Sequence, residues 1–111
     1  MPVQNPAILA HSFLAMMTAD SYFPDRLVAK GRQILLDLCE AIEREAPVGE
    51  AVYALTHAAT ERFNALDEEL HEAESEIETA ARDEIAVDVE FILETYGYEV
   101  DLEEALAPRD W

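Results

Sequence analysis

The large apolar side chains between residues 50 and 71 are separated by three or four positions, which is the spacing of one face of an α-helix. The residues on this face are Val52, Leu55, Ala59, Phe63, Leu66 and Leu70. Segments near 6–18, 25–45 and 76–96 show the same kind of spacing, and no run of four residues alternates convincingly as a β-strand. The spacing therefore predicts an all-α protein with four amphipathic helices.

Turn and capping residues separate these four segments. Asn5 is a suitable N-cap for the first helix, and the stretch 47–49 contains the proline and glycine that end the second. Ser75 and Glu78 have the spacing of a capping box before the fourth helix. Asp101 can cap a short helix near the C-terminus. Because the connections are short, we predict an antiparallel bundle of four helices with a short fifth C-terminal helix.

Residues 1–111 are expected to form one domain, because this length is typical of a single hydrophobic core. The sequence contains no run of 18 apolar residues, so no membrane-spanning helix is predicted. The first basic side chain is Arg26, so a secretory signal with a charged start is not expected. The one cysteine, Cys39, lies among helical apolar residues and is predicted to be a buried, inert thiol. These features favour a cytoplasmic protein.

Acidic residues are concentrated in the later part of the chain. Residues 1–44 carry 4 basic and 5 acidic side chains, whereas residues 45–111 carry 3 basic and 20 acidic ones. The formal net charge of the whole chain is −18. Nucleic acids and anionic membranes are polyanions that this charge would repel, so we expect neither as a partner. A basic protein is the partner that the charge favours.

The acidic helix pair near residues 61–90 is the predicted docking surface for a basic partner. Residues 67–90 contain 11 acidic side chains and one basic side chain, Arg82. The residues expected to contact the partner are Glu61, Glu68, Glu69, Glu72, Glu76 and Asp83. The function predicted from this surface is a non-enzymatic binding protein, and one concrete form is a toxin-neutralising immunity protein that covers a cationic active site.

An alternative function is metal binding by carboxylates and histidines on the polar face of the third helix. One stripe of that face contains His57, Glu61, Asn64, Glu68 and His71. Two of these residues, Glu68 and His71, have the Glu-x-x-His spacing of di-iron bundles. Those bundles direct two such pairs inward, whereas this stripe lies almost opposite the apolar face, so a solvated surface is the simpler interpretation. No resident cofactor is expected.

Catalytic motifs are not evident. The chain has no glycine-rich phosphate loop, and no serine and histidine are spaced with an orienting acid as a nucleophilic triad requires. Paired carboxylates are so frequent that they carry no information about acid–base catalysis. The sequence therefore leaves enzymatic activity open, with a binding role favoured.

Three stretches are similar to a known family: ALTHAATERFN at 54–64, SEIETAAR at 75–82 and RDW at 109–111. Together they resemble small acidic bacterial proteins grouped as the domain of unknown function 5713, from about Ser21 onward. The resemblance implies a bacterial, cytoplasmic, helical protein. It implies no particular activity, cofactor or site residue.

Overall fold

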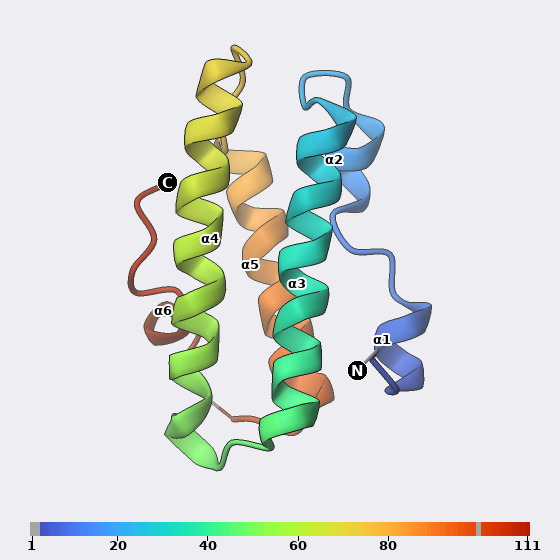
Figure 1. Cartoon of the computed structure of the whole chain (residues 1–111), viewed down its shortest axis with the longest axis vertical. Coiled ribbons are helices and arrows are strands. Elements are labelled where there is room, and N and C mark those ends of the chain that lie inside the picture. The colour runs from blue at the N-terminus through green and yellow to red at the C-terminus, as the bar shows by residue number, and fades with distance from the viewer. Residues whose placement is uncertain (1–2, 100) are drawn as a thin grey trace.

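Three long helices form the body of the protein, in a computed structural model that describes residues 3–99 and 101–111. They are α3 (Asp25–Glu45), α4 (Val52–Glu72) and α5 (Thr79–Thr95). The three helices lie side by side, and each runs in the opposite direction to the one before it (Figure 1). The described residues contain no β-strand, so the predicted all-α class is confirmed.

The two central helices lie where the apolar spacing predicts them. α3 has the predicted bounds, and α4 follows a single 3₁₀ turn, η1 (Gly49–Ala51). Ala46 ends α3 in the left-handed conformation, with a φ of 45°, and its amide donates to the carbonyl of Ile42. Pro47 then prevents the helix from continuing. This tight connection returns the chain along α3 as α4.

The prediction of one helix near 6–18 is wrong. Two short helices, α1 (Pro6–Ala10) and α2 (Ala15–Ala19), take its place. Asn5 caps α1 as predicted, because its side-chain oxygen accepts two amides of the first turn. Leu14 separates the helices in the left-handed conformation, with a φ of 54°. A bent N-terminal arm beside α3 therefore replaces the first of the four expected helices (Figure 1).

Two carboxylates of α5 bind the backbone of this arm where α2 begins. Glu84 accepts the amides of Met16 and Met17, at 2.7 and 3.0 Å. Asp88, one turn further along α5, accepts the amide of Leu14 at 2.8 Å. The first amides of a helix have no acceptor within the helix, and a negative charge also interacts favourably with the helix dipole there. α5 therefore caps α2 through its side chains.

A third carboxylate holds the other end of the arm. Glu43 of α3 accepts the amides of Gln4 and Asn5, at 2.8 and 3.2 Å, and the hydroxyl of Tyr96 donates to the same carboxylate. Burial opposes ionisation of Glu43, but these three hydrogen bonds outweigh it and lower the carboxyl pKa below its ordinary value of 4.5. The backbone of the arm is thus bound to α3 before α1 and to α5 at the start of α2.

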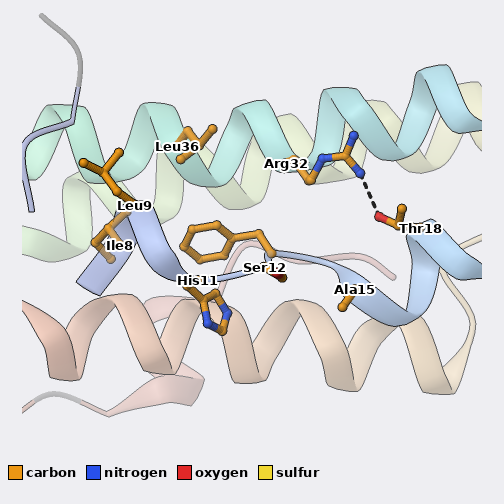
Figure 2. Close-up of a pocket in the computed structure, with 9 residues that line it drawn as sticks. Ile8, Leu9, His11, Ser12, Ala15, Thr18, Arg32 and Leu36 are labelled. Carbon is orange, nitrogen blue, oxygen red and sulfur yellow. Dashed lines mark hydrogen bonds between the residues drawn. The ribbon is translucent and has the colours of Figure 1, made fainter. Parts of the chain in front are cut away.

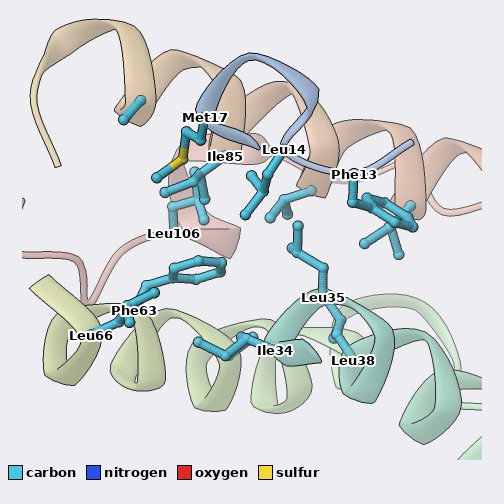
Figure 3. Packing of buried hydrophobic residues seen from close by; sticks show 14 of the residues in the cluster. Phe13, Leu14, Met17, Ile34, Leu35, Leu38, Phe63, Leu66, Ile85 and Leu106 are labelled. Atoms are coloured by element: carbon cyan, nitrogen blue, oxygen red, sulfur yellow. The ribbon is translucent and has the colours of Figure 1, made fainter. Parts of the chain in front are cut away.

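The hydrophobic core extends from Ile8 in α1 to Leu106 just after α6. Side chains of the arm and α5 oppose side chains of α3 and α4 across this core (Figure 3). Leu14 is fully buried there. Its close approach to α3 depends on Gly31, because a Cβ at that position would lie 2.8 Å from Leu14 Cδ1. The missing side chain of Gly31 therefore makes room for the arm.

The predicted capping box before the fourth helix is not formed. α5 begins at Thr79 rather than at residue 76, and Glu78, which precedes it, makes no side-chain capping bond. The hydroxyl of Ser75 is buried and has no hydrogen-bond partner among the described residues. Ser75 cannot reach the first turn of α5 as an N-cap would, because it lies four residues before that helix.

Ser75 belongs instead to the turn that ends α4. Glu74 is left-handed, with a φ of 61°, and the amide of Ser75 donates to the carbonyl of Leu70 at 2.7 Å. This geometry is a Schellman motif built without glycine. Asp67 of α4 then accepts the amide of Ile77 at 2.8 Å. The turn is tied back to α4, which leaves Ser75 buried beneath it.

The C-terminal region follows its sequence prediction. Gly97 has a φ of 83° and ends α5, with the amide of Tyr98 donating to the carbonyl of Leu93 at 2.8 Å. Asp101 caps the predicted short helix, α6 (Leu102–Ala105), by accepting an amide of its first turn.

His11 Nε2 lies 2.9 Å from Asp88 Oδ1, so this carboxylate holds the His11 ring as well as the Leu14 amide. Replacement of Asp88 by asparagine is expected to destabilise the protein by about 1–3 kcal/mol, because an amide has one acceptor oxygen where the carboxylate has two. The exposed Asp83→Asn on the same helix makes the same chemical change and should alter stability by less than about 0.5 kcal/mol. Urea denaturation measures both values, and hydrogen exchange should show lost protection first at the Leu14 amide. Equal stabilities for the two variants would contradict this role of Asp88.

The stabilisation from Glu43 is expected to decrease at acidic pH. Its pKa is lower in the folded protein than the ordinary 4.5, so its contribution is complete above that value and is lost as the pH falls through the folded pKa. Urea denaturation should therefore show a larger stability difference between the wild type and Glu43→Gln at about pH 7 than at about pH 3. Glu90→Gln serves as control, because Glu90 is exposed on α5 and has no partner in the described part of the chain. A difference for Glu43→Gln that does not vary with pH would exclude the mechanism.

Candidate functional site

The outward face of α4 carries a stripe of acidic side chains. Glu61, Glu68 and Glu72 recur at helical spacing, opposite the buried apolar face. All three are exposed, and none forms a hydrogen bond or an ion pair within the described part of the chain. We call these three residues the acidic stripe. It presents negative charge that no neighbouring side chain neutralises.

The other three predicted contact residues lie outside this stripe. Glu76 is exposed in the turn after α4, where its carboxylate is 3.8 Å from His71 Nε2. Asp83 is exposed on α5. Glu69 faces α3, and Lys30 Nζ donates to its Oε1 at 2.5 Å. The structure therefore brings together three of the six predicted residues on one helix face and pairs Glu69 internally.

A second ion pair joins α3 and α4 beside Glu69. Arg62 Nη1 donates to Asp37 Oδ2 at 2.8 Å. Burial opposes ionisation of Asp37, but hydrogen bonds from Arg62 and Gln33 outweigh it and lower the carboxyl pKa. Because both pairs are largely exposed, each contributes about 0–1 kcal/mol. Their main consequence is that this side of α4 is neutralised, whereas the acidic stripe is not.

The polar stripe that suggested a metal site holds the C-terminal segment instead. His57 Nε2 donates to the carbonyl of Glu104 at 2.7 Å. The side chain of Asn64 forms two bonds: Nδ2 donates to the carbonyl of Pro108 at 3.0 Å, and Oδ1 accepts the amide of Asp110 at 3.1 Å. A side-chain amide can satisfy a peptide donor and acceptor together. Asn64 is thus a backbone clamp.

Metal binding by this stripe receives no support from the geometry. Within residues 3–99 and 101–111, no group of three or more histidine, cysteine or acidic side chains is arranged to hold an ion. His57 is engaged with a backbone carbonyl, and His71 lies 3.4 Å from Asp67, which also accepts a backbone amide. The sequence spacing of Glu68 and His71 therefore does not produce a ligand set.

Trp111 anchors the end of the chain to α4. Its ring centroid lies 6.1 Å from that of Phe63, with the rings edge to face. The guanidinium carbon of Arg109 lies 5.6 Å from the centroid of the Trp111 ring, within the range of a cation–π contact. The C-terminal segment therefore covers one side of α4 and leaves the acidic stripe open beside it.

Cys39 provides no nucleophile. It is fully buried in α3, which confirms the predicted buried thiol. Burial and the nearby carboxylate of Glu43 raise the thiol pKa to about 12, so the reactive thiolate is not formed at neutral pH.

Among the described helices, none combines the length and the apolar character needed to cross a membrane.

Replacement of Asn64 by alanine is expected to release the C-terminal segment, because two backbone groups lose their partners at once. Trp111 reports this release: its fluorescence should shift to longer wavelength and its anisotropy should fall. The exposed Glu61→Ala, on the same helix, should leave both signals unchanged. Wild-type tryptophan signals in Asn64→Ala would show that the clamp does not position the segment.

The comparisons with known proteins give one match. No curated protein and no solved structure is significantly similar to this chain. The family described as "Family of unknown function (DUF5713)" matches residues 7–111, which include the arm from α1 onward, the acidic stripe and the C-terminal clamp. The chain therefore belongs to the DUF5713 family.

Proposed function

We propose that this protein is a non-enzymatic binding protein whose acidic stripe docks a basic protein partner. The observation that supports the proposal is that Glu61, Glu68 and Glu72 are exposed, share one helix face and have no partner in the described part of the chain. Charges that are already paired, such as Glu69 with Lys30, offer less to a partner. The unpaired stripe retains its full capacity to attract cations.

The geometry of the stripe limits the kind of partner. Glu61 and Glu72 are separated by about 16 Å along the helix axis, at the usual rise per residue. A complementary surface therefore carries lysines or arginines along a ridge or groove of similar length, rather than in one deep pocket. Arginine matches carboxylates best, because its planar fork forms two parallel hydrogen bonds. The remaining acidic charge of residues 45–111 would accelerate encounter at low salt.

A toxin-neutralising immunity protein is one concrete form of this function. In that form the stripe covers the cationic active site of an enzyme, and the negative charge excludes its anionic substrate. We place the protein in the bacterial cytoplasm. That location is supported by the family resemblance and by a single cysteine that remains a buried free thiol.

The triple variant Glu61→Gln, Glu68→Gln, Glu72→Gln tests this proposal. Affinity purification from the native host at low salt should retain a basic protein on the wild type and lose it on the triple variant. Removing three interfacial charges should slow association by about tenfold or more. A step to moderate salt should release the same protein from the wild type.

A matched control removes the same charge elsewhere. Glu50, Glu94 and Glu99 are exposed acidic residues outside the stripe, and their triple glutamine variant should retain the partner. Thermal unfolding verifies that both triple variants fold. Retention of the same proteins by both variants would contradict docking at the stripe. Inhibition of the captured protein's enzymatic activity by the wild-type chain would support the immunity form.

A further inference from the structure

A groove of about 560 Å³ lies between the N-terminal arm and α3 (Figure 2). Its apolar lining comes from both elements: Ile8, Leu9, Phe13 and Ala15 from the arm, and Leu36 from α3. The volume is within the range of roughly 300–1,000 Å³ typical of small-molecule sites. Leu9 remains 63% exposed beside it, so its apolar surface is accessible to a ligand in the groove. The groove is separate from the acidic stripe.

One end of the groove is polar and cationic. Arg32 Nη1 donates to the hydroxyl of Thr18 at 2.7 Å, and that hydroxyl donates to the carbonyl of Leu14 at 2.8 Å. The guanidinium forms no ion pair with a carboxylate in the described part of the chain, and none of the lining residues is acidic. Arginine has five N–H donors, so most of them remain available to a ligand.

Arg32 differs from the two arginines of the chain that form ion pairs. Arg44 and Arg62 each pair with a carboxylate, at 3.2 and 2.8 Å. Arg32 instead donates to a neutral hydroxyl, in a chain with 25 acidic residues. The hydrogen bond holds the guanidinium at the groove without neutralising its charge. Because no carboxylate of the described chain pairs with Arg32, the guanidinium is available to the anionic group of a ligand.

The polar and apolar parts of the groove are arranged in sequence along α3. Figure 2 shows Arg32 and Thr18 at one end and Ile8, Leu9 and Leu36 at the other. Leu36 lies one turn from Arg32, about 6 Å along the helix. An elongated ligand with an anionic head and an apolar body matches this order.

His11 does not provide a second anion-binding group. Its ring points toward α5 in Figure 2, where Nε2 lies 2.9 Å from Asp88 Oδ1. The ring also stacks on Phe91, with centroids 4.1 Å apart. Arg32 is therefore the cation on which recognition of the head group depends.

We infer that this groove binds a small amphipathic carboxylate, with the carboxylate on Arg32 and the aliphatic chain along Leu36 toward Leu9. The fork of arginine favours two parallel bonds to a carboxylate, and the apolar walls exclude water from the chain. Acidic residues farther away than the Debye length, about 8 Å at physiological salt, repel the ligand only weakly. The two carboxylates of α5 beside the arm, Glu84 and Asp88, are already engaged by its backbone amides. This site is a second binding function, independent of the docking of a basic protein.

Octanoate is the probe for this inference, and octanamide, which has the same chain and a neutral head, is its control. Both are added below the concentration at which they aggregate to ¹⁵N-labelled full-length protein in physiological salt. Octanoate should shift the amide signals of Phe13, Arg32 and Leu36, whereas octanamide should bind about tenfold more weakly because it lacks the charge-assisted pair.

Two variants separate the head from the chain. Arg32→Gln should lower octanoate affinity about tenfold, to the level of octanamide, and leave octanamide affinity unchanged. The exposed Arg26→Gln on α3 serves as the charge-matched control and should retain wild-type affinity for both. Leu9→Ser should weaken both probes by the same factor, because it removes only apolar contact. The amide spectrum of each variant without ligand verifies its fold.

The inference is wrong if octanamide binds as tightly as octanoate, or if Arg32→Gln and Arg26→Gln reduce octanoate binding equally. Signal shifts spread over α4 and α5, without a maximum at the groove, would also overturn it. None of these outcomes bears on the acidic stripe, because its test removes charges on α4 alone.

Discussion

The position of the N-terminal arm depends on three carboxylates that accept its backbone amides. Helices as short as α1 and α2 are not stable in isolation, because the entropy lost in forming the first turn exceeds the stabilisation from its hydrogen bonds. Glu43, Glu84 and Asp88 supply acceptors where those turns have none. Leu14 can then enter the core against Gly31. Among the amides that these carboxylates accept, that of Leu14 is buried, so the loss of Asp88 would leave it unsatisfied at a cost of about 1–3 kcal/mol.

The acidic residues of this protein therefore serve two different purposes. Glu84 and Asp88 of α5 bind backbone amides and stabilise the fold. Glu61 and Glu68 of α4 have no internal partner. In the sequence all four are acidic residues of amphipathic helices, and helical spacing gives no means of distinguishing them. What separates them is the element that packs alongside: the arm lies against α5, whereas solvent lies against the outer face of α4.

How much of the structure was predictable follows from the range of the interactions involved. The bounds of α3 and most of α4 were predicted correctly, because apolar periodicity and breakers such as Pro47 act locally. The break at Leu14 was not predictable, because a leucine in the left-handed conformation has no local preference for it and is held there by Asp88, distant in the sequence. The capping box failed for a related reason: the left-handed residue at the end of α4 is Glu74, where a glycine would have signalled a longer turn.

The candidate site was predictable in part. The part that was not predicted consists of contacts between residues that are distant in the sequence. Helical spacing alone places Glu61, Glu68 and Glu72 on one face of α4, but it does not show that Glu69 pairs with Lys30 while these three remain unpaired. The roles of His57 and Asn64 depend on where the C-terminal segment lies, which their own surroundings in the sequence do not reveal. Asn64 did carry a weak signal, because asparagine is a poor residue for the middle of a helix and often has a specific hydrogen-bonding role there.

The uneven charge of the chain has a spatial counterpart that local patterns do not show. The arm and α4 lie on either side of α3 (Figure 1), so the nearly neutral groove and the acidic stripe are on different sides of one helix. A basic partner attracted to α4 is thus not drawn to Arg32, whose own charge repels it. An anionic ligand is repelled by the stripe but meets a local cation at the groove. Under the two proposals, the uneven charge of the chain separates ligands of opposite sign on two sides of α3.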